Sequence, residues 1–514
     1  MKNQLILVCA FFLISIKFLG AQQSTFQLRL TSNGSNEDAA AAIENANGNI
    51  VVATSSYLNN QLDVVIAEVS SSGNLLQQFN YGSSGNESVK SMIQTSDNSY
   101  LITGAVYNTP SDYDWFIIKL DPAFGFLWYK RYSTTGNDLA NSCYEISPDH
   151  YIVTGTVAHG GSAKPSVVRI DGSGNVLGEG YLTTNQFASP NYRGRYLGNG
   201  LVGFVNLANA FAVLDTNGTL IKNCSFNNST FTRDIASSGN GGFAAVGVAG
   251  FGGPSGSGLS FIITDSSLTS FPVALKFSTN IASLEPAMMT KDAAGNYWIA
   301  ATETSLSSGN EVPVIMKISA SGSLLFAKSI LPPAVGGAGL RSISILSDGG
   351  ILVSGHIALG SSSFIAKIDS SGNGCNVSNL SVNSTVLSSI STVPHTSYIA
   401  SLNNPLTIGS STSAITLNQN LLCSTTSISE ESFEKPLVTV LPTLFHSGFE
   451  IRCEGGMRVK MQIKLTDMQG RAVLLQDVVE GQFIDTDHLS QGFYLLSVYS
   501  GNAILGNPIR MVRY

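Results

Sequence analysis

The stretch Asp97–Tyr132, DNSYLITGAVYNTPSDYDWFIIKLDPAFGFLWYKRY, decides the fold. It contains a polar turn, an apolar run ending in Thr-Gly, a polar loop, a second apolar run, an Asp-to-Gly turn and a third run. Val, Ile, Tyr, Phe and Trp dominate the runs, whereas Asp, Asn, Pro and Gly fill the gaps between them. The stretch therefore predicts three β-strands joined by short turns.

The same pattern returns along most of the chain, at a period of about 50 residues. A turn precedes each of seven similar strands: IVVAT, YLITG, YIVTG, LVGFV, FAAVG, YWIAA and ILVSG. One such unit cannot bury both of its faces alone, so neighbouring units must stack around a ring. Residues 22–374 are therefore predicted to form an all-β, seven-bladed β-propeller. The contracted fourth unit leaves six or eight blades open as alternatives.

The ends of the repeat region predict how the ring closes. After Ser371-Gly372-Asn373 the pattern stops, so the seventh unit lacks its last strand. A matching piece, TFQLRLTSNGSNED, lies at Thr25–Asp38. We expect its strand to complete the last blade beside Phe364–Asp369, which would remove exposed sheet edges.

The composition and the first residues indicate export. Residues 1–21 have a basic start at Lys2, an apolar core at Leu5–Ile16 and the small-residue exit Leu19-Gly20-Ala21, which predicts a signal peptide. A buried strand or helix is the alternative. No other run approaches the length of a transmembrane segment. A net charge of −7 argues against nucleic acid as a partner. We expect a secreted protein, extracellular or attached to the outer cell surface.

The cysteines predict one disulfide and no metal site. Cys375 and Cys423 flank a Ser/Thr/Asn-rich connector, residues 375–431, and are the pair we expect to be joined. Partial β-structure and a flexible linker are both open for this connector. Cys143 and Cys453 fall within predicted strands, and Cys224 has no obvious mate. Neither CxxC nor Cys/His ligand spacing occurs, so no zinc site is expected.

The tail, residues 436–514, reads as about seven short strands and predicts a small Ig-like β-sandwich. Its opening around Pro442, the stretch Leu465–Arg471, the run Leu489–Val498 and a basic final strand resemble the C-terminal sorting domain, type A, of type IX secretion cargo. The residues that match the motifs are Pro442, Asp467, Gly470, Arg471, Gly492 and Tyr494. The chain has Leu441-Pro442-Thr443-Leu444-Phe445 where the family has a Pro-Asn-Pro-Phe core. An ordinary Ig-like adhesion module is the alternative.

The resemblance implies that the type IX secretion machinery is a partner of this chain. It also implies passage across an outer membrane, removal of the tail and attachment to surface lipopolysaccharide. The propeller repeats, at Tyr100–Gly104, Phe116–Asp121 and Ser371-Gly372-Asn373, resemble those of secreted Bacteroidetes-type proteins. Such repeats are common to many functions.

Catalytic motifs are missing from the sequence. It has no G-x-S-x-G elbow, no HExxH, no Walker A motif and no dinucleotide fingerprint, so neither catalytic residues nor cofactors are predicted. Asp63 and Asp114 occupy equivalent positions before the second strand of their units and are candidates for glycosidase carboxylates, with turn capping as the alternative. Trp115, Trp128 and Tyr129 are candidates to stack on a sugar ring, with a place in the core as the alternative.

These observations lead to one function and two alternatives. The leading hypothesis is an exported, monomeric and non-catalytic binding or adhesion module whose ligand is a glycan or an extracellular protein. The first alternative is an extracellular carbohydrate-active enzyme that uses acidic residues on one propeller face. The second is a structural or matrix component without a discrete ligand.

Overall fold

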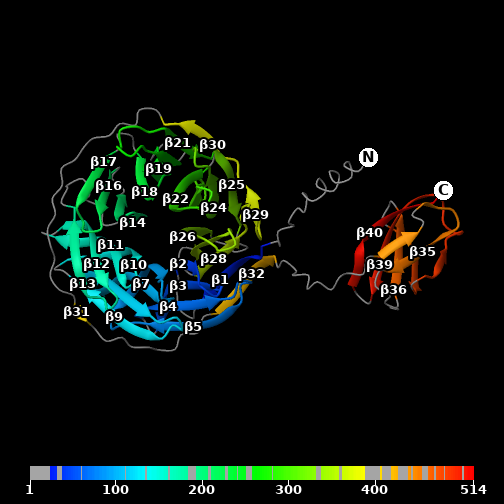
Figure 1. Ribbon diagram of the computed structural model, residues 1–514, viewed down its shortest axis with the longest axis horizontal. Coiled ribbons are helices and arrows are strands. Elements are labelled where there is room, and N and C mark those ends of the chain that lie inside the picture. Colours follow the sequence, from blue (N-terminus) through cyan, green and yellow to red (C-terminus); the bar gives the residue numbers. More distant parts are fainter. Residues whose placement is uncertain are drawn as a thin grey trace, which may run out of the picture. The chain divides into compact units, whose positions relative to one another are not determined.

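The chain forms two compact units, Met1–Ser427 and Ile428–Tyr514, which are described separately. The computed structural model (Figure 1) describes residues 23–31, 38–58, 61–109, 112–133, 136–159, 162–182, 193–205, 210–225, 230–239, 241–250, 257–279, 282–331, 337–357, 362–387, 406–407, 418–425, 438–441, 444–453, 461–467, 471–479, 481–500 and 503–513. All regular elements in these ranges are β-strands.

The described residues of the first unit form seven antiparallel sheets. The first three sheets consist of β2 (Asp38–Glu44), β3 (Ile50–Leu58), β4 (Gln61–Val69) and β5 (Leu75–Tyr81); β6 (Asn86–Gln94), β7 (Tyr100–Thr109), β8 (Asp112–Leu120) and β9 (Phe126–Tyr132); and β10 (Leu139–Ser147), β11 (His150–His159), β12 (Ser162–Asp171) and β13 (Val176–Tyr181). The fourth and fifth consist of β14 (Arg193–Gly198), β15 (Leu201–Val205), β16 (Ala210–Asp215) and β17 (Leu220–Ser225); and β18 (Thr230–Ser237), β19 (Phe243–Ala249), β20 (Gly258–Ile263) and β21 (Val273–Ser278). The sixth consists of β22 (Ala282–Lys291), β23 (Tyr297–Ser305), β24 (Glu311–Ile318) and β25 (Leu324–Ile330), and the seventh of β26 (Ala338–Ile345), β27 (Ile351–Ile357), β28 (Ser362–Ile368) and β1 (Thr25–Thr31).

The seven sheets are arranged in a closed ring (Figure 1). The first strand of each sheet contacts the first strand of the next, in the order β2, β6, β10, β14, β18, β22 and β26, and β26 contacts β2 again. These first strands therefore make up the inside of the ring. Four-stranded sheets repeated radially in this way are a β-propeller.

The N-terminal strand completes the seventh sheet, which confirms the prediction from the sequence. In β1, Phe26 pairs with Lys367 of β28, Leu28 with Ile365 and Leu30 with Ser363. Phe26, Leu28 and Leu30 are fully buried. The first and last parts of the repeat region are thus held together by backbone hydrogen bonds within one sheet.

Apolar side chains fill the space between neighbouring sheets. Val51 and Ile66 of the first sheet pack in one cluster with Tyr100, Ile102 and Phe116 of the second. Every residue of β27 and of β28 is buried, because sheets cover both faces of these strands. This burial agrees with the stretches ILV and FIA in their sequences, where apolar residues follow one another without alternating with polar ones.

The two ends of the ring differ in their chain connections. At one end, which we name the turn end, short turns join the first strand to the second and the third to the fourth. In ten of them, and in the turn that follows β28, the N–H of the first residue donates to the carbonyl of the fifth, at 2.7–3.0 Å; the first residues are Asn45, Ser70, Thr95, Asp121, Asp171, Asp215, Ser238, Asp292, Ser319, Leu346 and Asp369. At the opposite end, the connection end, the links between strands differ in length. The link between β3 and β4 consists of residues 59–60, whereas the link between β13 and β14 consists of residues 182–192.

The turn end shows why Asp recurs in the sequence motif. The Oδ1 atom of Asp121 accepts hydrogen bonds from the N–H groups of Ala123 and Gly125, at 2.8 and 2.7 Å. Asp369 makes the same two contacts with Ser371 and Asn373, at 2.9 and 2.7 Å. One carboxylate oxygen thus satisfies two backbone donors that the turn leaves without a strand partner.

Four short strands that follow the repeats pair on the outer edges of the sheets. They are β29 (Val377–Asn379), β30 (Asn383–Val386), β31 (Leu406–Thr407) and β32 (Asn418–Thr425). Their partners are β25, β21, β9 and β1, which belong to the sixth, fifth, second and seventh sheets. We name these four strands the belt, because their order follows the ring around its outside (Figure 1). The described parts of the connector are therefore strands of the first unit.

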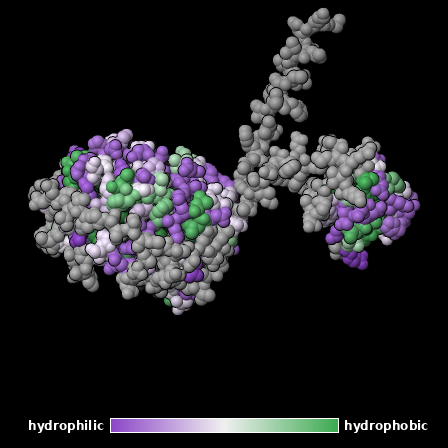
Figure 2. Space-filling model, turned by 90° about the horizontal axis from the view of Figure 1, so that it is seen from below, coloured by the Kyte–Doolittle hydropathy of each residue, from purple (hydrophilic) through white to green (hydrophobic). Residues whose placement is uncertain are grey.

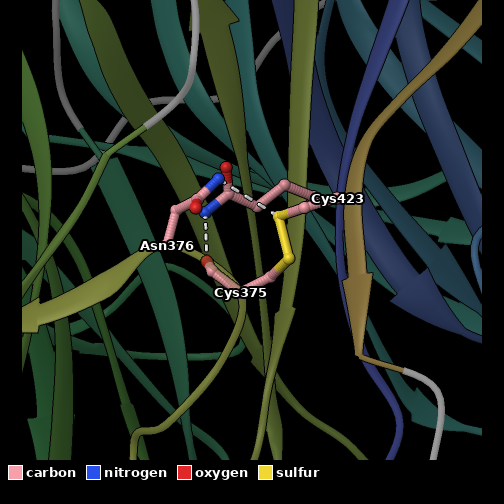
Figure 3. The surroundings of a disulfide bond; sticks show 4 residues. Cys375, Asn376 and Cys423 are labelled. Atoms are coloured by element: carbon pink, nitrogen blue, oxygen red, sulfur yellow. Dashed lines mark hydrogen bonds between the residues drawn. A yellow bond between two sulfur atoms is a disulfide. The ribbon is translucent and has the colours of Figure 1, made fainter.

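A disulfide between Cys375 and Cys423 joins the two ends of the belt (Figure 3). Asn376 donates a hydrogen bond from Nδ2 to Cys423 Sγ at 3.3 Å, and Gln27 of β1 donates to the carbonyl of Cys375 at 2.5 Å. Cys143 of β10 is buried and forms no disulfide, and burial raises the pKa of its thiol to about 12. The side chains of Cys224 and Cys453 lie outside the description.

Removal of this disulfide is expected to destabilise the first unit. In the Cys375→Ser/Cys423→Ser variant, a loop of 48 residues is no longer closed in the unfolded chain, so we expect a loss of about 2–4 kcal/mol. Urea unfolding measures it. The wild type under dithiothreitol should match the variant, and the variant should not respond to dithiothreitol. Equal stability of wild type and variant without reductant would show that the belt is held by strand pairing alone.

The second unit contains two further sheets around its own core. One sheet consists of β33 (Val438–Leu441), β35 (Gly448–Cys453) and β38 (Phe483–Asp485). The other has the order β34 (Leu444–Phe445), β40 (Ala503–Arg513), β39 (Gly492–Ser500), β36 (Met461–Asp467) and β37 (Ala472–Val478). Phe449 and Ile451 of the first pack with Ile463, Leu465 and Leu496 of the second, and all five are fully buried.

The described surface of the first unit mixes hydrophilic and hydrophobic areas (Figure 2). Four half-exposed leucines are the second residues of the fourth strands in four different sheets: Leu76, Leu127, Leu177 and Leu325. Leucines spread singly in this way are ordinary on a protein surface. Among the described residues, no helix has the length and apolar character needed to cross a membrane.

Candidate functional site

Two buried carboxylates from neighbouring sheets lie close together at the connection end. Asp63 is the third residue of β4 in the first sheet, and Glu87 is the second residue of β6 in the second sheet. Asp63 is 7% exposed and Glu87 is fully buried. Gly82, beside Asp63, leaves room for the carboxylate, because a Cβ atom there would collide with its Oδ1 and Cγ atoms.

The segment between β5 and β6 holds one oxygen of Glu87. Glu87 Oε1 accepts hydrogen bonds from the Ser83 hydroxyl and from the Ser83 N–H, the latter at 3.1 Å, and from the Tyr129 hydroxyl at 3.3 Å. Gln61 of β4 fixes the same segment by donating to the carbonyls of Ser83 and Gly85. Glu87 is therefore held in place from both sheets.

The other oxygens of the pair are buried without a partner. Asp63 Oδ1 and Glu87 Oε2 make no hydrogen bond to the described residues. Burial raises the pKa of Asp63 to about 6. Burial, together with the nearby charge of Asp63, raises the pKa of Glu87 to about 7, although hydrogen bonds from Ser83 and Tyr129 oppose the shift. Both shifts favour the protonated form, because two buried like charges are costly.

An ion pair extends the cluster into the second sheet. Asp114 of β8 lies opposite Val106 of β7, which in turn lies opposite Glu87 of β6, so the two acids occupy one row of the sheet. Asp114 is 1% exposed and forms a salt bridge with Arg131 of β9. Burial raises the pKa of Tyr129, and the neighbouring Glu87 raises it further, whereas Arg131 acts against the shift. Asp114 is thus charge-compensated, unlike the Asp63–Glu87 pair.

The three predicted aromatic residues lie in the core or against neighbouring sheets. Trp115 is 1% exposed and donates from Nε1 to the carbonyl of Thr156 in the third sheet, at 2.7 Å. Tyr129 is 2% exposed. Trp128 is half-buried and donates to the carbonyl of Gly172 at 3.0 Å. At these positions Trp115 and Tyr129 cannot present a ring face to an outside ligand, and their role is to pack neighbouring sheets.

Sequence reasoning found part of this cluster and missed Glu87, the carboxylate whose pKa is raised most. It named Asp63 and Asp114 from their equivalent positions in two units, and Tyr129 as an aromatic candidate. Glu87 escaped it, because an acid in the turn-like stretch SSGNE has no distinguishing neighbour in the sequence. The only available signal was its place at the start of a strand, which the turn pattern already explains.

The cluster can hold and release a proton, because its two carboxylates have pKa values above their usual range. Within the described ranges, no group of three or more His, Cys, Asp or Glu side chains is placed to hold a metal ion. The raised pKa values of Asp63 and Glu87 mean that the buried pair can hold a proton near neutral pH.

This proton is expected to make the stability of the first unit depend on pH. The folded chain binds it more tightly than the unfolded chain, where the pKa of Glu87 is near 4.5. The stabilisation is complete below that pH and is lost as the pH rises through about 7. Glu87→Gln keeps an oxygen acceptor without the charge, so we expect it to be more stable than the wild type at pH 8, by about 2 kcal/mol, and close to it at pH 5.

Urea unfolding at pH 5 and pH 8 measures this dependence. Asp369→Asn, in a solvent-facing turn, makes the same change of charge and serves as the control. An equal response of both variants to pH would mean that the buried pair does not hold a proton.

Four of the six residues in the sorting-domain motifs lie in described parts of the second unit. Asp467 accepts from the N–H and from Nε of Arg471, at 3.0 and 2.8 Å, and thereby ties the two ends of the turn between β36 and β37. Tyr494 is buried, and its hydroxyl donates to the carbonyl of Ser490. Gly492 begins β39. Pro442 and Gly470 lie outside the described residues.

Several solved structures are similar to the first unit. The β-propeller domain of the Trilobed protease from Pyrococcus furiosus is 11% identical and covers 65% of this chain and 94% of its own, with a TM-score of 0.38. BamB from Moraxella catarrhalis is 12% identical and covers 66% and 100%, with a TM-score of 0.35. U3-55K is 11% identical and covers 66% and 98%, with a TM-score of 0.44. No curated protein matches the chain.

The second unit matches a family. Residues 444–506 match the model of the secretion system C-terminal sorting domain, and they include most of the strands of this unit. The match implies interaction with the type IX secretion machinery and export, followed by secretion or attachment to the outer surface.

Proposed function

We propose that this protein is an exported binding module: a monomeric, seven-bladed propeller that contacts a glycan or an extracellular protein with its connection end. In this proposal residues 22–374 form the blades, and residues 436–514 form an Ig-like sorting domain of type A. The chain leaves the cell after loss of the signal peptide, residues 1–21, and is released or held at the surface.

The difference between the two ends of the ring carries this proposal. Eleven turns at the turn end share one hydrogen-bonding pattern, which leaves little room for variation. The connections at the other end vary in length, from the two residues 59–60 to the longer stretch 182–192. Connections of varied length on a rigid scaffold are where binding residues are usually found. Tyr57, 36% exposed in β3, and the Tyr107–Tyr113 ring pair, 5.2 Å between centroids, lie beside these connections.

The test is retention of the secreted chain on immobilised polysaccharides and extracellular proteins, with released sugar ends measured in the same samples. Retention without products supports the proposal. Tyr57→Ala should weaken retention, whereas Phe126→Ala, 39% exposed but at the turn end, should leave it unchanged. A larger loss of retention in Phe126→Ala than in Tyr57→Ala would place binding at the turn end and contradict the proposal. Absence of retention of the wild type on every surface would refute it.

A second candidate function is that of an extracellular carbohydrate-active enzyme. The observation that favours it is the Asp63–Glu87 pair, because carboxylates with raised pKa values serve as acids in glycoside hydrolysis. In that case the same assay would show released sugar ends, and Glu87→Gln would abolish them while leaving retention intact. The burial of Glu87 places the pair behind the surface, which is why binding is the first choice.

A further inference from the structure

Six of the seven innermost strands carry a β-bulge near their middle. The bulges lie between Ala39 and Ala41, Val89 and Ser91, Ala140 and Ser142, Thr232 and Asp234, Pro286 and Met288, and Leu340 and Ser342. The residues inside them are Ala40, Lys90, Asn141, Arg233, Ala287 and Arg341, of which three are basic and none is acidic. All six have solvent-accessible surface, although most of their neighbours are buried. The bulges therefore turn these residues toward the inside of the ring.

Around one of these bulges, three arginines from two strands converge on residues Glu285–Met289 of β22. Arg195 of β14 contacts Asp234 at 2.5 Å and also donates to the carbonyl of Met289, in a sheet two places along the ring. Arg193, two residues earlier, donates to the carbonyl of Ala287 at 2.9 Å. Arg233 of β18 lies 3.6 Å from Glu285. We name Arg193, Arg195 and Arg233 the arginine cluster.

The arginine cluster has more positive charge than its acidic partners compensate. Asp234 is fully buried, and its carboxylate already accepts several hydrogen bonds. The donors are Arg195 and the N–H groups of Met289 and Ile235, the last two at 2.7 and 2.9 Å. Glu285 is the second acid of the group. Arg193 has only a carbonyl oxygen as its described hydrogen-bond partner. Three guanidinium groups thus face two carboxylates, within a chain whose net charge is −7.

Arg233 retains unused hydrogen-bonding capacity. Its Nε atom is buried and has no hydrogen-bond partner among the described residues. Burial lowers the pKa of Arg233, and the neighbouring positive charge of Arg193 lowers it further, against the opposing effect of Glu285. Arg193 contacts Ala287 and Arg233 contacts Glu285, two residues apart on β22, so two like charges meet at one stretch of this strand, and an anion between them would compensate both.

We propose that the arginine cluster is a binding site for an oxyanion, such as a carboxylate, sulfate or phosphate group, with Arg233 and Arg193 as its principal donors. A planar guanidinium group offers the paired N–H donors that such anions accept. β14, β18 and β22 all begin at the connection end, and Arg193 is the first residue of β14, so the site extends from the middle of these inner strands toward the end of the ring proposed for binding. The inference that the anion is part of a glycan rests on that proposed function, whereas binding of a free oxyanion does not.

Calorimetric titration of the secreted chain with sodium sulfate, in a chloride buffer, tests the site. We expect saturable binding of one sulfate by the wild type, weakened about tenfold to hundredfold in Arg233→Gln. Arg169→Gln is the matched control, because Arg169 of β12 also has a buried, unpartnered Nε but belongs to the third sheet, outside the arginine cluster. Its affinity for sulfate should equal that of the wild type. Thermal unfolding checks that each variant is folded.

A second arm identifies the source of the anion. A sulfated or uronic-acid oligosaccharide that displaces sulfate from the wild type shows that the site accepts the anionic group of a glycan, and sulfate binding without displacement shows a site for a free oxyanion. Absence of saturable binding by the wild type, or equal binding by Arg233→Gln, overturns the proposal. If Arg233→Gln does not fold, Arg193→Gln gives the same test. Retention on surfaces is measured separately, so failure of this site and failure of the proposed function are distinguishable.

Discussion

Deletion of residues 436–514 is expected to abolish delivery of the chain outside the cell. The second unit contains the matched sorting domain and forms its own core, and none of its described strands lies in a sheet of the first unit. Its removal therefore takes away the export signal and leaves the propeller sheets complete. We expect the truncated chain to be depleted from the medium and the outer surface to background and to accumulate inside the cell envelope, as measured by fractionation and immunoblotting.

Two controls separate loss of the signal from loss of folding. The truncated chain should unfold at the same temperature as the first unit of the full chain. Residues 428–514, fused to an unrelated exported protein, should direct that protein to the surface. Delivery of the truncated chain at the wild-type level would contradict the sorting role of the second unit.

Replacement of Asp234 by alanine is expected to be among the most destabilising single changes in the first unit. Asp234 is fully buried, is paired with Arg195, and accepts from the backbone N–H of Met289 in the next sheet. Without it, the Arg195 guanidinium loses its counter-charge and keeps only the carbonyl of Met289 as an acceptor, and the N–H of Met289 loses its side-chain acceptor. Loss of one partner from a buried ion pair costs about 3–5 kcal/mol. Urea unfolding of the secreted chain measures the effect.

The double variant Asp234→Ala/Arg195→Met shows whether the uncompensated charge is the cause. Since it removes both members of the pair, we expect it to recover a large part of the stability lost in Asp234→Ala. Asp215→Ala, in an exposed turn between β16 and β17, should cost less than either. A double variant as unstable as the single one would attribute the loss to the Met289 contact instead of the arginine.

Much of the first unit could be predicted from local sequence, because its turns and strands are determined locally. Asp121 and Asp369 satisfy two backbone donors each, and this recurrence marks the period of the sheets. The missing last strand and the spare strand at Thr25 predicted the pairing of β1 with β28. The belt could not be predicted in this way. Strands as short as Leu406–Thr407 are held by backbone hydrogen bonds to a sheet edge, which require no particular side chains.

The candidate site was less predictable, since its properties arise between sheets. Asp63 was identifiable from its position in the repeat, but its raised pKa depends on burial beside Glu87, which belongs to the next unit. Arg195 and Met289 are separated by 94 residues, and the arrangement of the fourth, fifth and sixth sheets around the inside of the ring brings them into contact. Trp115 and Tyr129 stood out by residue type, which does not distinguish an inter-sheet core from an exposed face.

The disulfide also determines how the protein would bear mechanical load. A pull on the chain beyond Thr425 first reaches β32 and then Cys423, which is bonded to Cys375 directly after the last repeat. Tension therefore passes from Cys423 to Cys375 through a covalent bond and bypasses β29, β30 and β31 between them. In a protein tethered by its C-terminal side, shear would strain the seventh sheet while the rest of the belt remained slack. Reduction of this one bond would reroute the force and let the belt peel away strand by strand.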